Sequence, residues 1–102
     1  MAKLQSPNLI ADFTYHNNCP FLSNCSYSMS GAYANVGNST ATGANVKFTF
    51  YSQPDDTGQV LCATTYILGD VSAQSVATLS SVSCDGSSST QTQSATYQFA
   101  WG

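Results

Sequence analysis

The stretch that decides the fold is ANVKFTFY, residues 44–51, in which apolar and polar side chains alternate. Val46, Phe48 and Phe50 fall on one side of an extended chain, whereas Lys47 falls on the other. Successive side chains of a β-strand point to opposite faces of its sheet, so this period of two is typical of a half-buried strand. The stretch therefore predicts a strand with one face in a hydrophobic core.

The same alternation recurs on both sides of this stretch, and no helical spacing competes with it. We expect strands over residues 9–15, 26–35, 45–51, 59–68, 76–84 and 95–101. Clusters of Gly, Pro, Asn, Asp and Ser between them predict turns at residues 17–20, 37–40, 54–58, 69–70 and 85–87. A Ser/Thr/Gln segment over residues 87–94 is expected to be a mobile loop. Together these signals predict an all-β, immunoglobulin-like two-sheet sandwich of six to seven short antiparallel strands, with a small closed barrel as the alternative.

The inward phase of these strands gives the expected hydrophobic core. Its members are Phe13, Tyr27, Met29, Tyr33, Val46, Phe48, Phe50, Leu79, Tyr97, Phe99 and Trp101. Two further tyrosines are candidates for ligand contact by stacking against a sugar. Tyr51 falls on the opposite face of its strand from Phe50, and the pattern does not decide on which face of its strand Tyr66 lies.

Composition limits the class of the protein. Hydrophobic residues make up 42% of the 102 residues, enough for one core, but charged residues only 7%, against about 25% in average soluble domains. A surface covered by uncharged polar side chains is commoner on secreted and cell-surface proteins. We expect one sandwich domain over residues 8–102. Residues 1–7 are expected to be a linker or an added start, because they lack the apolar run of a signal peptide.

The charges exclude two classes of partner. The net charge is −3 and the only basic side chains besides His16 are Lys3 and Lys47. Binding to nucleic acid needs clustered Lys and Arg, and so does a polybasic membrane anchor. No segment approaches the roughly 20 apolar residues of a spanning helix. We therefore expect no nucleic acid partner and no direct insertion into a membrane.

The four cysteines allow three disulfide pairings. A zinc site is the weaker interpretation, because the chain has no C-x-x-C pair and a single histidine. Cys19 and Cys25 flank a short stretch that contains Pro20, which predicts a local bridge, and Cys62 then pairs with Cys84. Because disulfides persist in oxidising compartments, the cysteines favour an extracellular or cell-surface location.

Four segments carry a resemblance to a known family. The segments are GAYANVGN (31–38), ANVKFTFY (44–51), GQVL (58–61) and LGDV (68–71). In the same order, they are similar to the family motifs G-x-V-x-N-x-G, A-x-N-V-x-V-x-F-x-L-Y-D, G-x-V-L and L-G-x-L-x-P-G-E. Over residues 27–82 the chain resembles the FxLYD domain, a small prokaryotic extracellular β-sandwich module, and SPNL, residues 6–9, is similar to the opening of the related CARDB domains. Phe50 stands where the family has Leu, Ser52 where it has Asp, and residues 73–75 replace its Pro-Gly-Glu. The motifs consist of turn glycines and core apolar residues, so the resemblance implies a fold and no particular chemistry.

Few residues could support catalysis or bind a metal. His16 lies beside two asparagines in an expected turn, and no G-x-S-x-G motif supplies a nucleophile. Asp55 and Asp56 are adjacent in the sequence PDDTG, which is typical of a β-turn and has too few acidic ligands for calcium. We therefore expect no enzyme activity, no catalytic residues, no metal and no cofactor.

Two N-x-S/T sequons make Asn24 and Asn38 candidate glycosylation sites. Both lie at expected turns. Asn38 is the better acceptor, because the residue after Asn24 is a cysteine that we expect in a disulfide.

These features favour a non-catalytic extracellular or cell-surface module of structural or adhesion type, whose partners are other proteins, copies of itself or glycans. The alternative is a self-assembling subunit of an extracellular fibre or pilus, in which the strands at residues 9–15 and 95–101 pair with neighbouring copies by strand addition. The charge-poor sequence suits this alternative, because few lysines guard the strand edges. A carbohydrate-binding module is a further alternative.

Overall fold

The computed structural model describes residues 6–102, which contain six β-strands and no helix. The strands are β1 (Leu9–Asn18), β2 (Ser26–Asn35), β3 (Ala41–Gln53), β4 (Thr57–Val71), β5 (Ser75–Asp85) and β6 (Ser94–Ala100). No helix able to span a membrane occurs in this part of the chain. Of the linker expected over residues 1–7, residues 1–5 lie outside the described residues, while the backbone of Ser6 is already bonded to Asn38.

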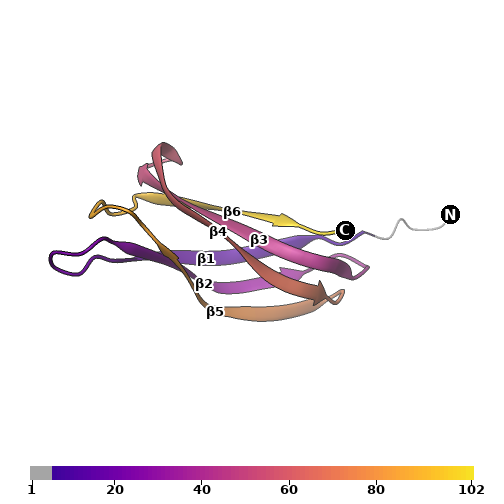
Figure 1. Cartoon of the computed structure of the whole chain (residues 1–102). Coiled ribbons are helices and arrows are strands. Elements are labelled where there is room, and N and C mark those ends of the chain that lie inside the picture. Colours follow the sequence, from indigo (N-terminus) through magenta and orange to yellow (C-terminus); the bar gives the residue numbers. More distant parts are fainter. Residues whose placement is uncertain (1–5) are drawn as a thin grey trace.

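The strands form two antiparallel sheets of three, in the orders β1-β2-β5 and β4-β3-β6 (Figure 1). This arrangement matches strands A-B-E and C′-C-F of an immunoglobulin-type sandwich. The predicted fold class is therefore confirmed. A closed barrel is ruled out for the described residues, because the two sheets share no hydrogen-bonded strand pair.

The core lies between the two sheets and is centred on the alternating segment of β3. Val46, Phe48 and Phe50 are fully buried, whereas Lys47 between them is exposed. From the opposite sheet Tyr27 stacks on Phe50 with ring centroids 5.5 Å apart. The remaining buried members of this cluster are Cys25, Met29, Leu79, Val82 and Cys84. The predicted phase of β3 is thus confirmed.

Two residues expected in the core are exposed instead, Tyr97 within β6 and Trp101 directly after it. The Tyr97 side chain faces inward because Tyr97 pairs with Phe48, but 43% of it stays exposed because no strand in the described residues flanks the outer side of β6. Trp101 is 39% exposed because it follows the last residue of β6 and no longer continues its alternation. Three further expected core residues are half-buried against the cluster, namely Phe13, Tyr33 and Phe99.

One predicted turn is wrong. Gly69 and Asp70 lie inside β4, which continues to Val71, and the chain turns at residues 72–74. Gly69 has a left-handed backbone, φ +76°, next to an irregularity in the register between β3 and β4. Both a β-bulge and a turn can require a residue with a left-handed backbone, so the glycine in the sequence could not show which of the two forms here.

Two disulfides link Cys19 to Cys25 and Cys62 to Cys84, the pairing that the sequence predicts. The first closes the loop between β1 and β2, and the second joins β4 to β5 across the two sheets. No free cysteine remains in the described part of the chain. Two bridges in so small a domain indicate an oxidising environment outside the cytosol.

Asn35 holds one end of the sandwich together. Its side chain is fully buried, and its Oδ1 accepts hydrogen bonds from the backbone N–H groups of Asn8 (3.1 Å) and Gly37 (3.0 Å). Its Nδ2 donates to the backbone oxygens of Ser39 and Val71, both at 2.9 Å. One side chain therefore joins the start of β1, the turn after β2 and the end of β4.

The segment expected to be a mobile loop is tied to the sandwich at several points. The Tyr27 hydroxyl donates to the backbone oxygen of Thr90, and the Cys25 N–H donates to that of Ser88. Thr92 is buried, its N–H donates to Oδ1 of Asn17, and Nδ2 of Asn17 donates back to its carbonyl oxygen. The segment is therefore held to the neighbouring strands by hydrogen bonds, instead of forming the mobile loop that its polar composition predicts.

Candidate contact surface

The two tyrosines that the sequence offers for sugar stacking do not form a common surface. Tyr51 pairs with Val60 on the outer phase of β3, whereas Tyr66 pairs with the core residue Val46 and so lies on the inner phase. Their positions along β3 differ by five residues, or about 17 Å at the usual rise of a strand. A stacking platform that uses both rings is therefore not present.

The ionisable side chains considered for catalysis or metal binding are exposed and lie on different elements. His16 is exposed on β1, opposite Ser28 of β2. Asp55 and Asp56 are exposed in the turn between β3 and β4, both with left-handed backbones. Within residues 6–102, no three His, Cys, Asp or Glu side chains are grouped so that they could hold a metal ion.

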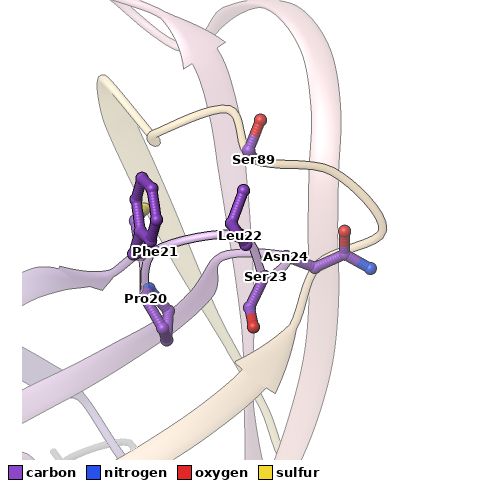
Figure 2. A pocket seen from close by; sticks show the side chains of 7 residues that line it. Pro20, Phe21, Leu22, Ser23, Asn24 and Ser89 are labelled. Carbon is purple, nitrogen blue, oxygen red and sulfur yellow. The ribbon is translucent and has the colours of Figure 1, made fainter.

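The most distinctive surface lies on the loop between β1 and β2. Phe21 and Leu22 at its tip are each 90% exposed. Both side chains leave the loop on the same side in Figure 2, beside a hollow that is also lined by Cys19, Pro20, Ser23, Asn24 and Ser89. None of these lining residues is charged. We call Phe21 and Leu22 the apolar tip.

The loop that carries the apolar tip is fixed at its base. The disulfide between Cys19 and Cys25 closes it, and the Ser23 N–H donates to the Pro20 backbone oxygen at 3.2 Å. Cys25 is bonded through its backbone to both Ser88 and Gly86 of the segment that follows β5. The tip is therefore presented from an anchored base.

The backbone at the tip is itself unusual. Leu22 has φ +62°, the left-handed region that non-glycine residues seldom occupy. Such a conformation persists only where the surrounding structure holds it, and Leu22 lies within the loop that the Cys19–Cys25 disulfide closes. The left-handed residue bends the chain at the point where the two apolar side chains are most exposed.

Comparison with known proteins does not assign the chain to a family. No protein-family model matches it, and no curated protein or solved structure matches it. The resemblance to the FxLYD and CARDB domains stays a prediction, and the function must be inferred from the geometry.

The sequence reasoning missed Phe21 and Leu22. Both fall between the two expected strands at residues 9–15 and 26–35, so no period of two applied to them. A usable signal was present, since two large apolar residues follow a proline inside a short cysteine-bounded loop. In such a loop there is no core to receive them.

Both candidate glycosylation sites are exposed. Asn24 lies in the same disulfide-closed loop as the apolar tip. Asn38 lies in the turn between β2 and β3, where its Oδ1 accepts a hydrogen bond from the Ser6 N–H at 2.8 Å.

Proposed function

We propose that this domain is a non-catalytic module of structural or adhesion type, located outside the cell or on its surface, that binds a protein partner through the apolar tip. The observation that carries the proposal is the 90% exposure of Phe21 and Leu22 on an anchored loop. Single exposed apolar residues are ordinary on protein surfaces. Two adjacent ones, held in place and free of neighbouring charge, resemble the anchors that dominate protein interfaces.

The anchored loop favours binding in energetic terms. Burying two large apolar side chains stabilises a complex by roughly 1.5–3 kcal/mol each. Because the disulfide already restricts the loop, less conformational entropy is lost on association than for a free loop. A partner with an apolar pocket would therefore gain most of its affinity at this tip.

The composition and the cysteines support the rest of the proposal. Two disulfides suit an extracellular location, and a surface that is poor in charge suits contact through neutral groups. The chain has one histidine and no glutamate, which leaves little material for the coupled titratable groups of a catalytic site.

The test is to select displayed peptides that bind the immobilised domain and to compare variants. Phe21→Ser with Leu22→Ser should weaken binding of the selected peptides at least about thirtyfold, the cost of losing one interface hot spot. The matched control is Ile67→Ser with Val76→Ser. It removes two apolar side chains that lie away from the apolar tip and are each 77% exposed. Equal binding by both double variants would refute the tip as the contact.

Strand addition is the second candidate function, because β6 is an edge strand that carries no charged residue. β6 pairs with β3 on one side only, so half of its backbone polar groups are available to another chain. No comparable observation supports a carbohydrate platform built on both Tyr51 and Tyr66, because the two residues lie on opposite faces of their sheet.

A further inference from the structure

The free edge of β6 occupies a defined position in the fold. In an immunoglobulin-type sandwich the strand equivalent to β6 is flanked by a seventh strand. In residues 6–102 no strand takes that place, and β6 lies at the edge of its sheet (Figure 1). Its outward N–H and C=O groups form a template on which another extended chain can pair.

The four edge strands are not equivalent. β4 and β5 are linked to each other by the Cys62–Cys84 disulfide. The edge strands other than β6 each contain an aspartate, and these are Asp12 in β1, Asp70 in β4 and Asp85 in β5. A charged side chain on an edge strand is one of the features that disfavour edge-to-edge pairing. β6, with the sequence SATYQFA, carries no charge and contains no proline.

The sequence of β6 also complements itself. It has seven residues, and Tyr97 is the middle one. In an antiparallel pair centred on Tyr97, Ala95 of one copy lies opposite Phe99 of the other, so that a small side chain meets a large one. On the other face Thr96 lies opposite Gln98, and two polar side chains meet. Cross-strand pairs of this kind stabilise a sheet.

The core-facing side of β6 has surface that a second copy would cover. Tyr97 is 43% exposed and Phe99 is half-buried. The Tyr97 hydroxyl donates to the backbone oxygen of Ala11 at 3.2 Å, and its ring lies edge-on to Phe13 at 5.1 Å. These contacts hold the ring on the open side between β6 and β1, next to the free edge.

We propose that β6 pairs antiparallel with β6 of a second copy, giving a closed dimer whose two-fold axis passes near Tyr97 and whose sheet runs β4-β3-β6-β6-β3-β4. The inference deepens the strand-addition candidate and is independent of the apolar tip. It commits to a self-complementary pair, which closes at two copies instead of growing into a fibre. One strand pair buries a small area, so the dimer forms reversibly as concentration rises.

The experiment is sedimentation equilibrium of the whole chain from micromolar to millimolar concentration. The mass should rise from the monomer's 10.7 kDa toward twice that value and stop there. Thr96→Glu with Gln98→Glu places like charges opposite each other twice across the dimer, while the new carboxylate at position 98 faces Lys47 within its own chain, and it should weaken the dimer roughly two- to thirtyfold. The control, Thr78→Glu with Ser83→Glu, adds the same charges to exposed positions of β5 and should leave the dimer unchanged.

A charge-reversed variant tests the direction of pairing. Thr96→Lys with Gln98→Glu places opposite charges together in an antiparallel pair, so the dimer should persist and become tighter at low salt. In a parallel pair in register the same variant would place like charges together. A dimer lost in this variant while wild type dimerises would overturn the antiparallel arrangement.

Hydrogen exchange on the wild type tests the same pairing without any variant, so it applies even if a variant folds poorly. Amide protection over Ser94–Ala100 of wild type should increase between dilute and concentrated samples. A wild type that stays monomeric, or a dimer indifferent to Thr96→Glu with Gln98→Glu, would overturn the proposal. Open-ended growth in mass would also overturn the closed dimer while supporting a fibre. Phe21→Ser with Leu22→Ser should leave dimerisation intact, which separates this test from that of the apolar tip.

Discussion

Replacing Asn35 by alanine should remove a large share of the stability of the domain. The side chain is fully buried and makes four hydrogen bonds, all to backbone groups. The bond to the Val71 oxygen is buried, so its loss costs the desolvation penalty of that group, about 1–3 kcal/mol. The other three are part-buried, and each contributes about 0.5–1.5 kcal/mol.

Together these contributions predict that Asn35→Ala lowers the free energy of unfolding by about 2.5–7.5 kcal/mol, compared with about 5–15 kcal/mol for a whole domain. The assay is urea unfolding with the disulfides intact, followed by tyrosine and tryptophan fluorescence. Asn45→Ala is the matched control, because Asn45 is a partly exposed asparagine on the outer phase of β3. It should cost under about 0.5 kcal/mol, the usual limit for a surface substitution.

Asn35→Asp sharpens the test, because aspartate keeps the acceptor but loses both donors. A carboxylate there faces the backbone oxygens of Ser39 and Val71, so burial and repulsion favour its protonated form, which can donate one bond. The folded-state pKa of that carboxyl is then raised, and the variant should gain stability as pH falls toward 4. An Asn35→Ala cost similar to that of Asn45→Ala would refute the reasoning.

Two further predictions concern the core. Phe48→Ala and Phe50→Ala should each cost about 3–5 kcal/mol, whereas Lys47→Ala between them should cost under about 0.5 kcal/mol; equal losses in denaturant melts would contradict the strand phase. Burial raises the pKa of the Tyr27 phenol above 10.0. The unfolded chain therefore ionises first, and the stability due to Tyr27 is lost as pH rises above about 10. Tyr27→Phe should flatten this alkaline decline in pH-dependent melting.

The sequence was informative where one local rule decides the outcome. Alternation around Val46 and Phe48 identified β3 and its buried face, because a strict period of two fits a half-buried strand and does not fit a helix. The short spacing of Cys19 and Cys25 indicated a local bridge, and the pairing of Cys62 with Cys84 followed.

It was less informative where the outcome depends on neighbours. The alternation of β6 includes Tyr97 among core residues, but it does not reveal that β6 lies at an edge. Gly69 supplies a left-handed residue without revealing whether the strand turns or bulges there. The apolar tip belongs to no repeating pattern, so Phe21 and Leu22 emerged only from their exposure in the fold. Most of the architecture could thus be predicted, and little of the contact surface.

The two disulfides have a mechanical consequence. They close loops with sequence separations of 6 and 22, and residues inside a covalent loop cannot lengthen when the chain is pulled by its ends. At roughly 3.3–3.6 Å of extended chain per residue, these two loops keep about 90–100 Å of contour length from being extended. The remaining length, including β1 and β6, can be drawn out. Under tension the domain would therefore give way at its terminal strands while the linked stretch of β4 and β5 stays short, and reduction of the disulfides would release the remaining length.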